Sequence, residues 1–343
     1  MKLKAASPGR MIPLILFLLL GSNVIKGQTA ETVKIWDKGE HNAFTGLIRY
    51  KSYFYCTFRE AKHHVPKDTS GNGTIRIIRS ADGIIWEPVA LLRSSVYDLR
   101  DPKLSVMPGK RLMVTMGGSH YINGTLEGMM PHVSFSDDGL QFSAPEPAKI
   151  QDDVKTDFDW IWRVTWKGKT GYGVVYQSQK PENIVRLLAT SDGISYRQVK
   201  QFEISSLPNE ATVRFDSDKN MLILLRREAK ANGMLGKSAP PYTEWKWTEL
   251  LYRLGGPDLL VMRNGNLIVG TRVYGGGPST TAIYLTSPEG KIIKQLDLPS
   301  GGDTSYPGLL IHKNKLMVSY YSGHEGRTSV YLSSIPLKDF VVR

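Results

Sequence analysis

The chain repeats one heptapeptide pattern at Ser80-Ala-Asp-Gly-Ile-Ile-Trp86, Ser136-Asp-Asp-Gly-Leu-Gln-Phe142 and Thr190-Ser-Asp-Gly-Ile-Ser-Tyr196. Each copy has a hydroxyl residue, any residue, Asp, Gly, two further residues and an aromatic ring. An Asp side chain can accept backbone N–H groups across a hairpin, and Gly tolerates a positive φ angle. A degenerate fourth copy is Thr286-Ser-Pro-Glu-Gly290. The pattern therefore predicts a recurring β-hairpin turn whose role is structural.

Strand-like runs recur around these turns, with starts 45 to 61 residues apart. The first set comprises Ser52–Cys56, Arg111–Thr115, Tyr172–Tyr176, Met221–Leu225, Asn266–Gly270 and Lys315–Ser319. After most of them a second run ends in a polar turn: Ile75–Ser80, His132–Ser136, Val185–Thr190, Ala282–Thr286 and Ser329–Ser333. Six repeats, each a small antiparallel sheet, predict an all-β fold, a six-bladed β-propeller.

Composition agrees with this fold class. The 343 residues include 33 Gly, 19 Pro, 16 Tyr and 7 Trp, which favour turns and strands over helices. The rival architecture, a β-sandwich with a second domain, would need a linker, and no low-complexity stretch divides residues 30–343. We therefore expect a single propeller domain at residues 28–343.

Residues 1–27 have the pattern of a secretory signal peptide, with basic residues before the apolar run Met11–Leu20 and small or polar residues up to Gly27. Cleavage there would reduce the formal charge of +12 to about +8. No Cys follows the apolar run closely, so we expect no lipid anchor and an exported, periplasmic or extracellular protein. The single Cys56 is expected to be a buried small hydrophobe.

Charged and phenolic side chains occur at matching places in the repeats. They are Arg59, Asp101, Arg163, Glu210, Arg226, Arg272 and Tyr306. Equivalent positions in a propeller converge on the central axis, where ligands usually bind. We therefore expect these groups to form one site, in the loops that flank the inner strands.

The residues also carry a resemblance to sialidases over nearly all of the mature chain. The three turns resemble the Asp box of that superfamily, although with one residue fewer before the aromatic position. Asn209-Glu210 and the strand ending at Arg226 resemble the sialidase segment in which an Asn-Glu precedes a strand that an arginine closes. Gly302-Asp-Thr-Ser-Tyr306 is similar to the segment that bears the nucleophilic tyrosine.

The resemblance implies a role for each matching residue. Tyr306 would be the nucleophile and Glu210 its partner, because a phenol with a pKa of about 10 needs a base to react at neutral pH. Arg226 and Arg272 would hold the substrate carboxylate. Asp101 or Asp68 would protonate the leaving oxygen. The implied activity is that of a retaining exo-glycosidase acting on sialic acid or a related acidic terminal sugar.

One departure concerns the first blade. Sialidases have an arginine of the carboxylate clamp there, whereas this chain reads His41-Asn-Ala-Phe-Thr-Gly-Leu47. Arg59 or Arg163 would have to substitute, and His41 and Asp303 complete the expected substrate-binding set. The missing arginine leaves open a different sugar, or a propeller that binds carbohydrate without catalysis.

Other functions are weakly supported by the sequence. His63, His64, His41 and Asp68 show no fixed metal-ligand spacing, so we expect exposed loop histidines and no metal. Phosphate-loop and dinucleotide motifs are absent from the sequence, which predicts no cofactor. The dispersed basic residues of an exported chain do not favour a nucleic-acid partner. A glycan is the expected partner, and a monomer is favoured.

Overall fold

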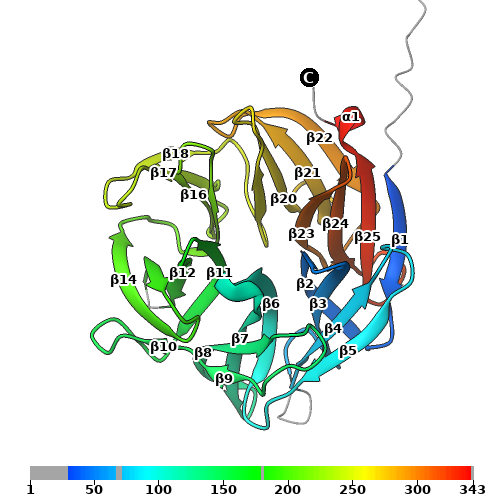
Figure 1. The fold of residues 1–343 in the computed structure, drawn as a ribbon, viewed down its shortest axis with the longest axis horizontal. Coiled ribbons are helices and arrows are strands. Elements are labelled where there is room, and N and C mark those ends of the chain that lie inside the picture. Colours follow the sequence, from blue (N-terminus) through cyan, green and yellow to red (C-terminus); the bar gives the residue numbers. More distant parts are fainter. Residues whose placement is uncertain (1–29, 67–71, 179–180, 341–343) are drawn as a thin grey trace, which may run out of the picture.

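The computed structural model describes residues 30–66, 72–178 and 181–340. In this part of the chain six antiparallel sheets surround a central axis (Figure 1), which confirms the predicted all-β, six-bladed propeller. The other regular elements are a 3-10 turn at Pro108–Lys110 and the four-residue helix α1 at Leu337–Phe340. The predicted signal peptide and Asp68 lie outside the described residues.

The blades follow one another along the chain. The first three consist of β2 (His41–Tyr50), β3 (Tyr53–Ala61), β4 (Thr74–Ser80) and β5 (Glu87–Leu92); β6 (Asp98–Val106), β7 (Leu112–Ile122), β8 (Thr125–Ser136) and β9 (Glu146–Pro147); and β11 (Asp159–Lys167), β12 (Thr170–Gln177), β13 (Ile184–Thr190) and β14 (Ser195–Phe202), with β10 (Lys149–Ile150) pairing parallel to β14.

The second half of the ring has the same plan. Its blades consist of β15 (Pro208–Phe215), β16 (Met221–Arg227), β17 (Met234–Ser238) and β18 (Lys246–Glu249); β19 (Asp258–Val261), β20 (Leu267–Val273), β21 (Thr280–Thr286) and β22 (Ile292–Leu298); and β23 (Thr304–His312), β24 (Lys315–Ser322), β25 (Ser329–Pro336) and β1 (Glu31–Trp36).

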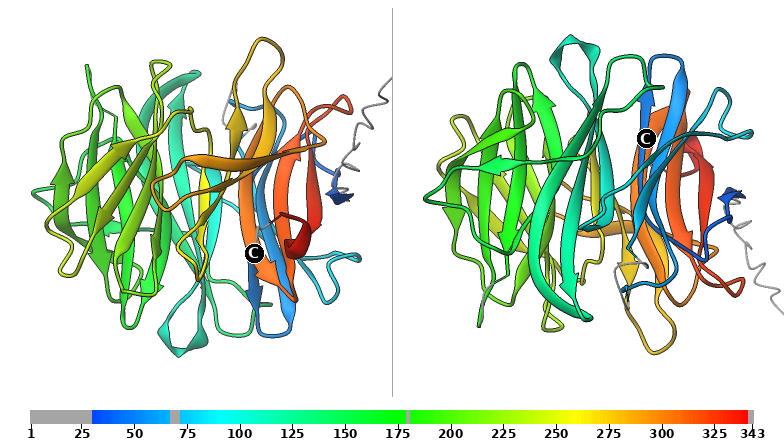
Figure 2. Two further views of the ribbon diagram at one scale, coloured as in Figure 1. Left: turned by 90° about the horizontal axis from the view of Figure 1, so that it is seen from above. Right: turned by 90° about the horizontal axis from the view of Figure 1, so that it is seen from below.

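The ring is closed by the N-terminal strand. β1 pairs antiparallel with β25 and forms the outer edge of the sixth blade, which otherwise comes from the end of the chain (Figure 1). Joining the two ends of the chain in one sheet covers the free edge of β25. The two side views show the blades standing side by side (Figure 2).

The innermost strand of each blade is its first strand, and these six strands contact one another around the axis. The strand-like runs of the first set recognised in the sequence lie in the second strand of each blade instead. Consequently Asp101, Glu210 and Tyr306 lie within the innermost strands rather than in flanking loops, which corrects the expected placement.

The hydrophobic core is divided among the blade interfaces. Six apolar clusters each combine side chains from two adjacent blades. Cys56 is fully buried in the cluster between the sixth and first blades, as expected, and burial raises the pKa of its thiol to about 12. A seventh cluster lies between the inner strands and is mostly aromatic: Ala43, Phe44, Trp160, Trp162, Tyr306 and Tyr321.

The three repeated turns join the third and fourth strands of blades one to three, and their geometry is that predicted. Asp82 Oδ1 accepts the backbone N–H groups of Ile84 and Ile85, and Ser80 Oγ accepts that of Gly83, whose φ is +85°. The turns at Asp138 and Asp192 repeat these bonds.

Among the described residues, none of the helices has the length and apolarity needed to cross a membrane.

Candidate active site

The candidate site is built on irregularities of the innermost strands. In five blades the pairing of the first and second strands is interrupted by a two-residue bulge, at Phe44-Thr45, Asp101-Pro102, Trp162-Arg163, Asn209-Glu210 and Tyr306-Pro307. A bulge turns side chains out of the regular alternation of a strand. Side chains from four of these five bulges meet, since Phe44, Trp162 and Glu210 all contact Tyr306.

Three of these positions have a strained backbone. The φ angles of Phe44, Asp101 and Tyr306 are 65°, 49° and 53°, in the left-handed region that non-glycine residues rarely adopt. Such a conformation costs about 1–3 kcal/mol and persists only where the surroundings enforce it. Here Thr45 Oγ1 donates to the Tyr306 carbonyl at 2.9 Å, tying the bulge of the first blade to that of the sixth.

Tyr306 and Glu210 form a hydrogen-bonded pair in the centre of the ring. The Tyr306 hydroxyl donates to Glu210 Oε1 at 2.7 Å, and both residues are less than a tenth exposed. Burial raises the pKa of Tyr306 well above its usual value, and the Glu210 charge raises it further. The phenol is therefore neutral at rest, and the group that accepts its hydrogen bond is the Glu210 carboxylate.

The Glu210 carboxylate is held in its ionised form. Burial alone would raise its pKa, but the positive charge of Arg226 and three hydrogen bonds hold the pKa below its usual value. Arg226 Nη1 lies 2.8 Å from Glu210 Oε1, and the backbone N–H of Gly256 donates to Oε2 at 2.8 Å. Glu210 is thus a base positioned to accept the Tyr306 proton.

Gly256 is required at this place for a steric reason. Its φ is +60°, and a Cβ atom there would lie 2.5 Å from Tyr306 Cγ. Only glycine lets the backbone approach the phenol ring closely enough to donate to Glu210.

Two arginines from the ends of second strands reach the pair. Arg226 Nη1 donates to the Tyr306 hydroxyl at 3.3 Å, while its Nη2 pairs with Glu228. The Arg272 guanidinium lies 5.4 Å from the Tyr306 ring centroid and donates to the Thr304 carbonyl and the Tyr321 hydroxyl. Within the described part of the chain Arg272 has no carboxylate partner, so its charge is available to an anionic ligand.

Asp101 is a buried carboxyl group near the same pair. Burial raises its pKa to about 6, although the charges of Lys103 and Arg100 oppose this shift. Its Oδ1 atom is buried and has no hydrogen-bond partner among the described residues. The neighbouring Lys103 donates to the Thr45 carbonyl at 2.8 Å, and burial lowers its pKa to about 7.

Arg59 and Arg163, one of which was expected to complete the clamp, are both buried and paired with carboxylates of the protein. Arg59 is 0% exposed, and its Nη2 lies 2.7 Å from Asp98 Oδ1. Arg163 donates to the Pro307 carbonyl at 2.9 Å and pairs with Asp258 at 3.3 Å. Arg59 has no exposed surface to offer a ligand, whereas Arg163 keeps a buried Nε atom without a partner among the described residues, so its place in the clamp stays a prediction.

Phe44 occupies the first-blade bulge, the position equivalent to Tyr306. Its ring packs against the Tyr306 ring with centroids 4.8 Å apart, and the Arg100 guanidinium lies 5.2 Å from its centroid. Arg100 thus brings a cation from the second blade to the first-blade side of the site. In the sequence, the one feature that could have pointed to Arg100 is its position next to Asp101.

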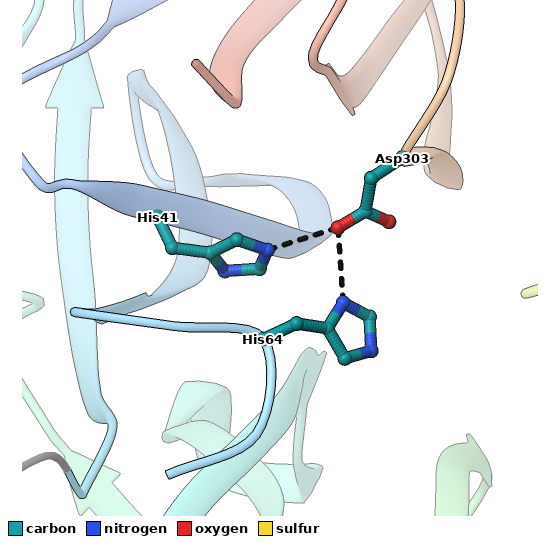
Figure 3. Close-up of side chains that lie close together, drawn as sticks. All are labelled: His41, His64 and Asp303. Atoms are coloured by element: carbon teal, nitrogen blue, oxygen red, sulfur yellow. Dashed lines mark hydrogen bonds and ion pairs between the residues drawn. The ribbon is translucent and has the colours of Figure 1, made fainter. Parts of the chain in front are cut away.

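His41 and Asp303 come together with a residue that we did not assign to the site, His64. His41 Nε2 and His64 Nδ1 each lie 2.9 Å from Asp303 Oδ2, and the Tyr321 hydroxyl donates to Asp303 Oδ1 at 2.7 Å (Figure 3). Burial would raise the pKa of Asp303, but these three hydrogen bonds hold it well below its usual value. The cluster adjoins the pair through Phe44, whose ring lies 5.3 Å from that of His64.

A cavity of about 720 Å³ lies between the second and third blades, lined by Met129, Thr156, Asp159 and Arg197 among others. None of the candidate catalytic side chains lines it, and Asp159 is already bound by Thr156 and Gln177. The candidate site is therefore the group of side chains around Tyr306 and Glu210.

Comparison of folds shows what this ring resembles. The chain aligns with a Dyadobacter fermentans protein of unknown function at a TM-score of 0.77, with 18% identity over 92% of this chain and 100% of the other. With the Hadza microbial sialidase Hz136 the TM-score is 0.71, with 16% identity over 88% of this chain and 67% of the other. The chain has a sialidase-like propeller fold. The chain also aligns with an α-L-arabinanase of Penicillium chrysogenum, at a TM-score of 0.69 and 16% identity over 91% of this chain and 99% of the other.

These likenesses, all at 18% identity or less, establish the architecture. No protein-family model matches the sequence, and no curated protein matches it. The activity of the sialidase-like propeller therefore has to be argued from its own residues.

Proposed function

We propose that the protein is an exported, retaining exo-glycosidase that removes an acidic terminal sugar, such as a sialic acid or a related 2-keto acid, from glycans. The observation that carries this proposal is the buried hydrogen bond of 2.7 Å between Tyr306 and Glu210. A tyrosine that serves only the packing of a core has no need of an ionised carboxylate beside its hydroxyl.

The pair suits a substrate whose anomeric carbon already bears a carboxylate. A carboxylate nucleophile would be repelled by that charge, whereas a neutral phenol is not. In the first step the Tyr306 oxygen forms a bond to the anomeric carbon, its proton passes to Glu210, and the bond to the leaving oxygen breaks. Water then attacks the same carbon, and Tyr306 recovers its proton from Glu210, so the configuration is retained.

The general acid in this scheme is Asp101. A carboxyl with a pKa of about 6 is partly protonated near neutral pH and can donate to the leaving oxygen. In the second step the ionised Asp101 takes a proton from the attacking water. Burial and the unpartnered Oδ1 atom support this role.

The substrate anion is assigned to Arg272 and Arg226. Arg272 supports the assignment because it lies over the Tyr306 ring without a carboxylate partner among the described residues. The altered first blade, with Phe44 at the bulge, supports a sugar that differs from sialic acid near its carboxylate. The fold neighbours include both a sialidase and an arabinanase, so a panel of sugars is the proper test.

The test is hydrolysis of aryl glycosides of sialic acid, other 2-keto acids, uronic acids and arabinose by the wild type and by Tyr306→Phe. We expect release of one acidic sugar and a loss of about a thousandfold or more in kcat for the variant. Tyr252→Phe is the matched control, since the Tyr252 hydroxyl is buried without a partner among the described residues. Cleavage of no glycoside would leave a carbohydrate-binding propeller as the function, whereas full activity of Tyr306→Phe would reject Tyr306 as the nucleophile.

A further inference from the structure

We propose that His41, His64 and Asp303 form a binding site for one divalent transition-metal ion of the zinc class. The three residues come from strand β2, from the segment after β3 and from the segment before β23. Figure 3 shows both imidazoles directed at one oxygen of Asp303. The three donor atoms, His41 Nε2, His64 Nδ1 and a carboxylate oxygen, all lie within 4.8 Å of one another.

The donor set determines the class of ion. Two imidazole nitrogens and one carboxylate oxygen suit Zn²⁺ and its neighbours in the first transition series, whereas Ca²⁺ and Mg²⁺ prefer oxygen ligands throughout. Two ligands that share a tetrahedral ion at about 2.1 Å each lie about 3.4 Å apart, so the nitrogen–oxygen separations of 2.9 Å would have to widen by about 0.5 Å. An ion therefore fits with small movements of the side chains.

The surroundings of the cluster also suit a metal. Tyr321 donates to Asp303 Oδ1, which fixes the carboxylate with its other oxygen toward the histidines. Such outer hydrogen bonds orient the ligands of protein metal sites. The nearby Arg59 and Arg100 share the Asp98 carboxylate, at 2.7 Å and 3.5 Å, which offsets part of the positive charge that an incoming cation meets.

The cluster is accessible from solvent and leaves coordination positions free. The side chains of His64 and Asp303 are 47% and 34% exposed, while that of His41 is 11% exposed. Three protein ligands leave at least one position for water or for a substrate oxygen, as in catalytic rather than structural zinc sites.

One feature lowers the expected affinity. His41 Nδ1 is buried and has no partner among the described residues, so the imidazole lacks the outer acceptor that zinc-bound histidines usually have. Losing such a partner typically weakens metal binding about 10- to 100-fold. We therefore expect Zn²⁺ to bind about 10- to 100-fold more weakly than at a site whose histidines both have such an acceptor.

The position of the ion gives it a use in the proposed reaction, and this part of the inference rests on the proposed function. Blade one has Phe44 where a clamp arginine is expected, and His64 packs against that ring. A divalent ion beside Phe44 would add positive charge to that of Arg100, which lies over the same ring and is paired with Asp98 at 3.5 Å. It would bind the carboxylate or a hydroxyl group of the sugar through its open position.

The experiment is calorimetric titration of chelator-treated protein with Zn²⁺, Co²⁺ and Mn²⁺ in the absence of any glycoside. We expect one ion per chain, and at least about tenfold weaker binding for His64→Ala and for Asp303→Asn. His63→Ala is the matched control, because His63 is an exposed neighbour in the same segment that does not belong to the cluster. Thermal unfolding without metal checks that all variants fold.

The outcomes separate this inference from the proposed function. Absence of saturable binding for all three ions, or equal binding by wild type, His64→Ala and Asp303→Asn, overturns the metal site. Ion binding without hydrolysis of any glycoside leaves the metal site intact and rejects the proposed activity. Hydrolysis that is unchanged by chelation and by added Zn²⁺ rejects the part assigned to the ion in substrate binding.

Discussion

The Tyr306 hydroxyl donates to Glu210 Oε1 over 2.7 Å across the central axis, between residues 96 positions apart in the chain. Arg226 Nη1 lies 2.8 Å from the same carboxylate oxygen and 3.3 Å from the phenol oxygen. One guanidinium therefore stabilises negative charge on whichever of the two oxygens carries it. The proton can move from Tyr306 to Glu210 without leaving a buried charge unpaired.

The first prediction is that Tyr306 and Glu210 act as one unit. Tyr306→Phe removes the nucleophile and Glu210→Gln removes its base, so each is expected to lower kcat about a thousandfold or more. The double variant should lose no more than the worse single variant, because either change alone already disables the step. Steady-state kinetics on the best aryl glycoside measures all three. Losses that multiply in the double variant would show that the two residues act separately.

The second prediction concerns pH. Asp101 must be protonated to donate, and burial raises its pKa from 3.8 to about 6. We therefore expect kcat/KM to fall as the pH rises through about 6. Asp101→Asn should remove this limb, with a large loss for glycosides of poor leaving groups and a small loss for nitrophenyl glycosides, which need little protonation.

Lys103→Met provides the control for this assignment. The Lys103 charge lowers the pKa of Asp101, so its removal should move the limb to higher pH. A limb that stays in place in Lys103→Met, or that persists in Asp101→Asn, would assign the titration to another group.

Much of this site was predictable because the repeat places equivalent residues at equivalent levels. Tyr306, Glu210, Arg226 and Arg272 were expected to converge, and their side chains lie within one network of contacts. The turns were predictable for a local reason, since the Asp, the Gly and the hydroxyl residue of each copy bond within a few residues of one another.

The innermost strands could not be recognised from the sequence, because the bulges interrupt their alternation. Asp101-Pro102 and Tyr306-Pro307 put a proline where a regular strand would need an N–H donor. The partners of the buried charged residues could not be predicted from the sequence either. Arg59 pairs with Asp98 of the next blade, and His41 pairs with Asp303 near the other end of the chain. No local sequence pattern predicts either pairing.

The third prediction separates charge recognition from catalysis. Arg272→Gln removes the cation that lacks a carboxylate partner among the described residues, so KM for the acidic sugar should rise about 10- to 100-fold. The methyl ester of the same sugar should be affected far less. Arg253→Gln is the control, because Arg253 stacks on Tyr274 at 4.0 Å beside the site and does not contact Tyr306. An equal rise in KM for the acid and for its methyl ester would mean that Arg272 acts only by holding the Tyr321 hydroxyl in place.

The fourth prediction tests whether Arg59 serves the fold or the substrate. Its guanidinium and the Asp98 carboxylate are both 0% exposed and joined at 2.7 Å, with a further bond at 3.1 Å. Asp98→Ala leaves the buried Arg59 without its carboxylate, and Arg59→Met leaves Asp98 with only the longer contact to Arg100 at 3.5 Å. Asp98→Ala should therefore lower the free energy of unfolding by about 3–5 kcal/mol, and Arg59→Met by less. Denaturant titration measures the loss, with Lys155→Ala, at an exposed pair with Asp152, as the control.

Both variants of the buried pair should give the wild-type KM at temperatures where they remain folded, because Arg59 has no surface to offer a ligand. A rise in KM for Arg59→Met with unchanged stability would mean that Arg59 leaves Asp98 to bind substrate and would restore it to the clamp.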